Sequence, residues 1–165
     1  MKKIIVRLAV IAALTLIPFQ KLFAETYIGV APGYSTKNES MTLGAWMSHD
    51  FSKAFRVNLG VDYVFRNQHT DAFLINLDFN FPLKLTTGDK IDIYPIVGLT
   101  YACWSHHPYP DGDDVTTREN KFGINLGAGV GYKVSSHLRL KLDARYSLVK
   151  HNNTTIISLG IGYAF

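Results

Sequence analysis

The sequence predicts an all-β protein: a closed antiparallel eight-stranded transmembrane β-barrel, preceded by a cleaved signal peptide. Three observations lead to this prediction. Apolar side chains alternate with polar or small ones at a period of two through most of the chain, which is the spacing of β-strands. The glycines of these stretches lie mostly on the polar face. Aromatic residues gather near the ends of the apolar faces, whereas aliphatic residues occupy the middle.

The start of the chain has the layout of a secretory signal peptide. A short basic beginning precedes the apolar run LAVIAALTLI at residues 8–17, and Ala24 is the expected cleavage position. The run is too short for a membrane-spanning helix, which needs about 20 apolar residues. We therefore expect residues 1–24 to be the signal peptide and residues 25–165 to form the barrel.

Eight stretches after Ala24 show the alternation of strands. The first two, TYIGVAPGY at residues 26–34 and MTLGAWMSHDF at residues 41–51, are the weaker ones. Pro95 is the one interruption in the six stronger stretches. These six lie at residues 55–65, 73–81, 91–101, 122–132, 138–148 and 157–165.

The lengths of the strands and of their connections fit a membrane barrel. Strands that cross a bilayer at a tilt need about 10 residues each. The links SKA, LTTGD and VSSH are tight, whereas STKNES, RNQHT, SHHPYPDGDDVTTREN and KHNNTT alternate with them on the opposite side. An even number of strands with short turns at one end is typical of outer-membrane barrels, and both termini are then expected in the periplasm.

A soluble lipocalin-like barrel also alternates, but with its apolar face turned inward. Glycine weakens strands, so a solvated outer face has no need of many glycines, whereas a crowded narrow lumen does. Two aromatic rims around an aliphatic band match the two edges of a bilayer. The glycines of the polar face include Gly123, Gly127, Gly129, Gly131, Gly160 and Gly162. Both patterns favour the membrane barrel.

The charge balance excludes a nucleic-acid-binding protein. The whole chain has 17 basic and 13 acidic residues, but four of the bases and none of the acids lie in residues 1–24. The remaining chain is therefore formally neutral and has no basic patch of the kind that binds nucleic acid. Its single cysteine, Cys103, has no partner in the chain for a disulfide.

The stretches DIYPIVGLTY, FGINLGAGVGYKVSSHLRLKLDARYSL and ISLGIGYAF resemble the small eight-stranded outer-membrane barrels of the OmpA/OmpX type, and more broadly the porin-like outer-membrane β-barrel families. The resemblance implies a location in the Gram-negative cell envelope, within outer-membrane lipid and lipopolysaccharide. It also implies that the last strand is the signal read by the outer-membrane assembly machinery. The residues that match this signal are Ile157, Leu159, Ile161, Tyr163 and Phe165.

Charged residues on the polar faces are the candidate functional residues. An eight-stranded barrel has an interior just wide enough for side chains, and charges withdrawn from water need partners. We therefore expect an interior polar network that fills the barrel; the alternative is a narrow porin-like channel for ions or small solutes. The expected network consists of Arg56, Asp62, Arg66, Asp78, Asp92, Lys133, Arg139, Lys141, Asp143 and Arg145.

The segment CWSHHPYPDGDD contains residue types that bind metals, yet its pattern fits no metal site. Adjacent histidines on an extended backbone point in different directions, and a calcium loop starting at Asp111 would need an acid where Phe122 stands. We interpret residues 105–120 as a solvated outer loop that could contact extracellular ligands. No metal and no cofactor are expected.

Some small outer-membrane barrels are lipid A-modifying enzymes, which makes an enzyme the least favoured alternative. The motif of the deacylase barrels, a histidine followed two residues later by Ser-Asn, is absent from KHNNTT at residues 150–155. We therefore expect no catalytic residues. The sequence predicts an integral outer-membrane protein with a structural and surface-interaction role.

Overall fold

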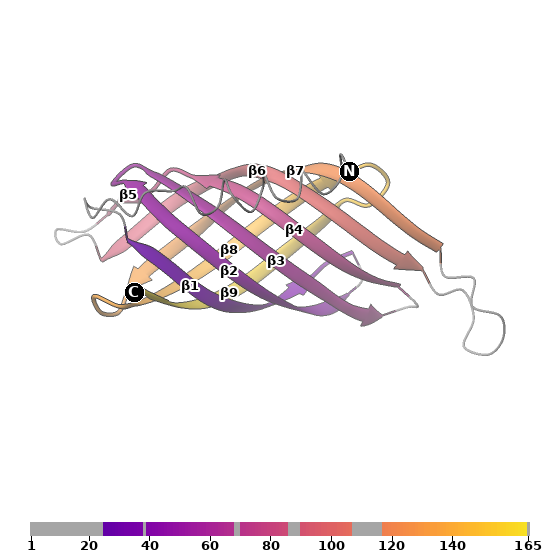
Figure 1. Cartoon of the computed structure of the whole chain (residues 1–165), viewed down its shortest axis with the longest axis horizontal. Coiled ribbons are helices and arrows are strands. Elements are labelled where there is room, and N and C mark those ends of the chain that lie inside the picture. Colours follow the sequence, from indigo (N-terminus) through magenta and orange to yellow (C-terminus); the bar gives the residue numbers. More distant parts are fainter. Residues whose placement is uncertain (1–24, 38, 68–69, 86–89, 107–116, 165) are drawn as a thin grey trace, which may run out of the picture.

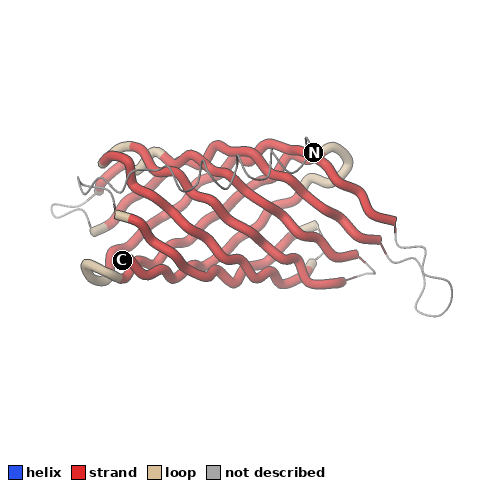
Figure 2. The backbone as a smooth tube through the Cα atoms, in the orientation of Figure 1, coloured by secondary structure: helices blue, strands red, loops and turns tan. Residues whose placement is uncertain are grey.

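The computed structural model describes residues 25–37, 39–67, 70–85, 90–106 and 117–164. In these ranges the chain folds into β-strands that wind around one central axis (Figures 1 and 2). No helix in the described part of the chain is long and apolar enough to cross a bilayer.

The eight predicted strands are confirmed, and a two-residue strand, β5, is added to them. The strands are β1 (Thr26–Ser35), β2 (Ser40–Ser52), β3 (Phe55–Asn67), β4 (Thr70–Asn80), β5 (Leu83–Lys84), β6 (Ile91–His106), β7 (Thr117–Lys133), β8 (Leu138–Val149) and β9 (Thr154–Ala164).

The eight long strands close into an antiparallel ring. Consecutive strands pair in order, β4 pairs with β6, and β1 pairs with β9 to complete the circle. The short β5 pairs only with β6, where Leu83 lies opposite Ile93. Every long strand therefore has two neighbours, which leaves none of them with the open edge that a lipid bilayer does not tolerate.

One connection differs from the sequence-based prediction. Strands β6 and β7 keep pairing as far as His106 and Thr117, so the ends of the expected loop 105–120 belong to a long hairpin. The predicted tight link LTTGD lies between β5 and β6, and its residues 86–89 are outside the described residues. On the strand side of this link, β5 continues the pairing with β6 beyond the end of β4.

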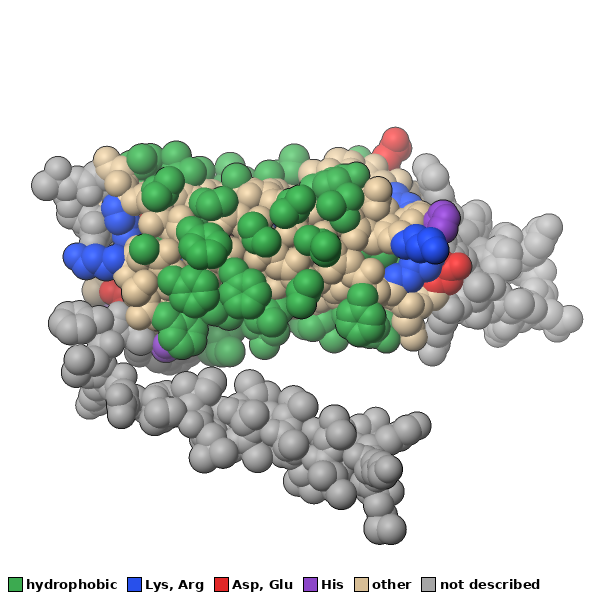
Figure 3. Space-filling view, turned by 90° about the horizontal axis from the view of Figure 1, so that it is seen from above, with side chains coloured by type: hydrophobic (Ala, Val, Ile, Leu, Met, Phe, Trp, Pro, Cys, Tyr) green, Lys and Arg blue, Asp and Glu red, His purple; other side chains and the backbone are tan. Residues whose placement is uncertain are grey.

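The wall of the barrel has its apolar side outward. Val30, Leu99 and Leu159 are each at least half exposed, whereas Asp62 and Asn76 are buried. In Figure 3, hydrophobic side chains spread over the barrel wall and charged side chains gather near its two ends. This arrangement is the reverse of a soluble barrel and matches a protein whose wall faces hydrocarbon.

The two ends of the barrel are named here by where its first strand begins and its last strand ends. At the terminal end, β1 begins and β9 ends (Figure 1); at the distal end lie the connection that follows β1 and the turn at residues 150–153. Aromatic side chains contact one another on the outer surface near both ends. The contacts include Phe51–Phe55 and Phe55–Phe81 at the terminal end, and Tyr63–Phe65 and Tyr101–Phe122 towards the distal end.

Candidate functional site

The lumen is the candidate functional site, and its layer nearest the terminal end is built around Asp50. One Asp50 oxygen accepts a hydrogen bond from Arg56 Nε at 2.5 Å, and the other accepts one from Arg139 Nη2 at 3.1 Å. Arg56 also donates to Asp92 at 2.9 Å, and Lys84 approaches Asp92 at 3.6 Å. Both guanidinium groups are almost fully buried, so their charges depend on these carboxylates.

Aromatic rings line the same layer and contact its cations. The Arg139 guanidinium lies 4.2 Å from the ring centre of Tyr27, and the Lys141 ammonium lies 4.2 Å from that of Trp46. Lys141 also pairs with Asp143 at 2.9 Å. The Tyr94 hydroxyl donates to the same carboxylate at 2.6 Å, so polar and aromatic groups together fill this part of the lumen.

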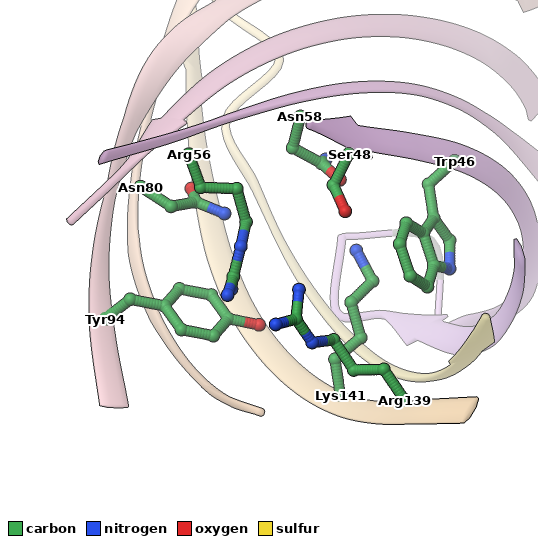
Figure 4. A pocket seen from close by; sticks show the side chains of 8 residues that line it. All are labelled: Trp46, Ser48, Arg56, Asn58, Asn80, Tyr94, Arg139 and Lys141. Atoms are coloured by element: carbon green, nitrogen blue, oxygen red, sulfur yellow. The ribbon is translucent and has the colours of Figure 1, made fainter. Parts of the chain in front are cut away.

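A small cavity of about 10 Å³ lies within this layer (Figure 4). Such a space has room for about one water molecule. The hydroxyl of Ser48, Oδ1 of Asn80 and Nε of Arg139 are buried and find no hydrogen-bond partner among the described residues. The cavity is lined by Trp46, Ser48, Arg56, Asn58, Asn80, Tyr94, Arg139 and Lys141.

Arg145 is the centre of the middle layer. Its guanidinium pairs with Asp62 and, at 3.1 Å, with Asp78. Asn125 Nδ2 donates to Asp78 at 2.8 Å and to Asn76 Oδ1 at 3.0 Å, and Asn76 in turn donates to Asp62 at 2.8 Å. These five side chains come from strands β3, β4, β7 and β8, so their bonds run across the lumen as well as along its wall.

The layer nearest the distal end is apolar. Its members, here called the distal apolar cluster, are fully buried although they lie close to a mouth of the barrel. The ammonium of Lys37 lies 4.9 Å from the ring centre of Trp104 and donates to the carbonyl of His151 at 3.1 Å. The cluster consists of Val64, Ala72, Leu74, Ala102, Trp104, Val149 and Ile156.

Two of the predicted network residues lie at the rims of the barrel. Arg66 is exposed, and its Nε lies 3.6 Å from Asp71, because the pairing of β3 with β4 shifts between Val64 and Asn67 and ends the regular alternation. The prediction of an interior Arg66 is therefore wrong. Lys133 is partly exposed at the terminal rim, where it binds Glu25 at 2.5 Å. The other predicted charged residues lie in the lumen: Arg56, Asp62, Asp78, Asp92, Arg139, Lys141, Asp143 and Arg145.

Sequence reasoning missed Asp50 and the distal apolar cluster. Asp50 follows Trp46 and Ser48 at steps of two, which predicts that it shares their face of the strand. The stretch that contains it alternates weakly, so this pattern is hard to recognise. Leu74 and Trp104 also alternate in step with the polar residues of their strands, but an apolar residue at such a position indicates a cluster only once the strands are placed side by side.

Glu25 ties the beginning of the barrel to its opposite side. Its carboxylate accepts hydrogen bonds from the Tyr27 hydroxyl at 2.6 Å and from Lys133 Nζ at 2.5 Å. Burial raises the pKa of Glu25, but the hydrogen bonds from Lys133 and Tyr27 and the nearby positive charges outweigh burial, so the pKa lies below its usual value. The charged carboxylate thus links β1 to β7.

The remaining sequence predictions fall on the outer surface or outside the described residues. Ile157, Leu159, Ile161 and Tyr163 point outward from β9, and Phe165 lies outside the described residues, as does Ala24. Within the described ranges, no group of three His, Cys, Asp or Glu side chains is placed to hold a metal. Residues 107–116, which include most of the metal-ligating residue types of the loop, are outside these ranges.

Comparison with known proteins connects this geometry to a family. The family described as "Outer membrane protein beta-barrel domain" matches residues 13–165. Comparison with curated proteins gives no match. Among solved structures, the N-terminal β-barrel domain of Pseudomonas aeruginosa OprF aligns with a TM-score of 0.70 at 16% identity, covering 86% of this chain and 97% of that one.

Two further solved structures show the range of roles found on this fold. Ail, the attachment invasion locus protein of Yersinia pestis, aligns with a TM-score of 0.61 at 14% identity, covering 86% of this chain and 97% of that one. The outer-membrane enzyme PagL aligns with a TM-score of 0.55 at 16% identity, covering 82% and 97%. At these identities the likeness concerns the fold.

Proposed function

The chain belongs to the outer membrane protein β-barrel domain family and lies in the bacterial outer membrane, and from this premise we propose that it is a non-enzymatic structural barrel with a closed lumen. Its role is to stabilise the envelope and to present its distal end for surface contacts. The observation that carries the proposal is the filling of the lumen by side chains in three successive layers.

The middle layer supports a structural role rather than a transport pathway. Arg145 is held by two carboxylates, Asp62 and Asp78, from different strands, and both carboxylates also accept amide hydrogen bonds. A conducting pore needs groups that release a passing ion and space for that ion to move. Here each charge is held by fixed partners in a barrel of the smallest common size.

The proposed orientation places the terminal end in the periplasm and the distal end outside the cell. It is supported by the eight-stranded count and by the longest hairpin, β6–β7, lying at the distal end. We assign residues 1–24 to a cleaved signal peptide. The outward apolar residues of β9, together with Phe165, are proposed as the signal for the assembly machinery.

Surface contacts are proposed for the β6–β7 hairpin. These two strands are the longest of the barrel, at 16 and 17 residues, and their distal ends extend beyond those of the other strands (Figure 1). Ail of Yersinia pestis has been solved in complex with the heparin analogue sucrose octasulfate. By analogy of fold, an extracellular polyanion is a reasonable first ligand to test here.

The proposal is tested by conductance measurements with purified, refolded protein in planar lipid bilayers. We expect no large, steady single-channel current, whereas a large-barrel porin inserted in the same membrane conducts. A steady current from this chain would favour the narrow channel, the second candidate, for which the lumen cavity provides a starting point.

The enzyme alternative needs a separate measurement, because PagL shows that this fold can carry catalysis. Mass spectrometry of lipid A from cells that overproduce the chain should match that from cells with an empty vector. A new lipid A species that depends on the chain would overturn the non-enzymatic proposal.

A further inference from the structure

The three layers of the lumen differ in how readily they are hydrated. The terminal and middle layers consist of charged and amide side chains, and the terminal layer contains the cavity and several buried polar atoms that find no partner among the described residues. Such groups hydrate readily, because a nearby water supplies the missing hydrogen bonds. These two layers fill the lumen sterically, but they do not repel water.

The distal apolar cluster contains a single polar side-chain atom, Nε1 of Trp104, which is buried and finds no hydrogen-bond partner among the described residues. Its seven side chains come from β3, β4, β6, β8 and β9, and each is at most 1% exposed. Apolar constrictions exclude ions because they offer no group that replaces the hydration shell, and they exclude water because a narrow apolar space stays dry.

Strands β1, β2 and β7 contribute no side chain to the cluster, and other groups fill the lumen beside them. On β7, a Cβ atom at Gly123 would lie 2.6 Å from Val149 Cγ2, so the Val149 side chain already fills that space. Between β1 and β9, the hydroxyls of Ser35 and Thr154 hydrogen-bond to each other at 2.9 Å and are both buried. On β2, Thr42 lies opposite Val64 and is buried, so buried side chains complete the ring at the level of the cluster.

Lys37 covers the cluster on its distal side. Its ammonium lies over the Trp104 ring and is anchored by the carbonyl of His151 and by the side chain of Asn152. Burial and the neighbouring Lys121 lower the pKa of Lys37. A cation held at this mouth also repels cations that approach the lumen from outside.

We propose that the distal apolar cluster, centred on Trp104, is the permeability seal of this barrel. This inference rests on the proposed closed lumen and adds to it the place and the residues of the closure. The polar layers determine the shape and stability of the barrel, whereas the cluster alone keeps water and small ions from passing between the distal mouth and the middle layer.

The seal is tested with a cysteine reporter placed just beneath it. Thr100 is 1% exposed, precedes Ala102 and Trp104 on the inward face of β6, and its hydroxyl has no hydrogen-bond partner among the described residues, so Thr100→Cys removes no such bond. The reporter is made in a Cys103→Ser background and refolded in detergent micelles, where both mouths are accessible. The measured quantity is its rate of reaction with a small cationic methanethiosulfonate reagent.

The reporter should react slowly when the cluster is intact. Trp104→Ala should raise the rate at least about tenfold, because the apolar constriction opens to water. Trp46→Ala is the matched control: it removes the same side chain from the lumen on the terminal side of the reporter and should leave the rate within about twofold, since the seal stays intact. Trp104→Phe should restore slow labelling. Leu74→Ala provides a second opening variant if Trp104→Ala does not refold.

Fast labelling with the cluster intact, no increase in either opening variant, or an equal increase with Trp46→Ala would each overturn the seal. These outcomes are distinguishable from failure of the proposed function. A closed lumen is judged by the conductance of the unaltered chain, whereas the seal is judged by the difference between the two tryptophan variants.

Discussion

Asp50 shows how one residue organises the terminal layer of the lumen. It receives hydrogen bonds from two guanidinium groups on different strands, Arg56 and Arg139, and its own side chain is only 14% exposed. Asp92 is the next carboxylate, at 2.9 Å from Arg56 but 3.9 Å from Arg139. Removing the charge of Asp50 therefore leaves Arg139 with the more distant Asp92, at 3.9 Å, as its ion-pair partner.

Asp50→Asn should lower the free energy of unfolding by about 3 kcal/mol, because it leaves two buried guanidinium groups to share the carboxylate of Asp92. Asp71→Asn is the matched control, since Asp71 pairs with the exposed Arg66 at the rim; its cost should stay below about 1 kcal/mol. Urea titration of the refolded protein in lipid, followed by tryptophan fluorescence, measures both changes. Equal costs for the two variants would contradict the assigned role of Asp50.

The residues of the lumen were predictable where the alternation was regular. Asp78 and Asp143 lie in strands with strong alternation, and their inward direction followed from their parity. Counted in steps of two along β3, Arg66 falls on the interior face. The register of β3 against β4 shifts after Val64, however, so alternation no longer predicts the side of the sheet there. No pattern within the β3 sequence alone reveals that shift.

At the scale of elements, the contact between β1 and β9 is the seam that closes the barrel. It lacks paired residues at Ala31 and Pro32, since proline has no amide hydrogen to donate to the ladder. The two backbones approach closely at Gly29, where an added Cβ would lie 2.7 Å from Gly162 Cα and 2.8 Å from Trp46 Cε2.

Gly29→Ala should destabilise the barrel by about 1–3 kcal/mol, because the new methyl group forces the seam or the Trp46 indole to move. Gly60→Ala is the matched control on β3, where the nearest atom to an added Cβ is 3.7 Å away. The urea midpoints of the two variants, with an unchanged slope, give the comparison. If Gly60→Ala costs as much as Gly29→Ala, close approach at the seam is not the cause.

The sequence predicts that the first and last strands pair, because a barrel in lipid must close. It also placed the glycines inside. The sequence does not predict which large side chain packs against each glycine, because that depends on the relative register of strands far apart in the chain. The packing of the Trp46 ring against Gly29 and Gly162 is an example.

At the scale of the whole molecule, the protein is a barrel whose outer wall is apolar and whose interior passes from charged to apolar along its axis. The outward apolar wall was predictable from period-two alternation and the placement of glycines. The gradient along the axis was not, because it arises only when side chains from five strands meet at one level.

Both tryptophans of the chain point into the lumen, which gives a test of the whole arrangement. In bilayers of brominated phospholipid, their fluorescence should be quenched only slightly, because the barrel wall separates the indoles from the bromine atoms. Ile157→Trp places a third indole on the lipid-facing side and should add a strongly quenched component. Strong quenching of the unaltered chain would show that the sidedness of the wall is wrong.

The pairing of β1 with β9 also has a consequence for how the chain reaches its folded state. Tyr27 lies opposite Ala164, so the two halves of this contact are separated by almost the whole folded sequence. A contact of such high sequence separation forms late, after the entropy of a long loop has been lost. Until β9 arrives, the partly folded sheet has two open edges and an apolar surface, which makes the exported chain dependent on protection from aggregation during its transit.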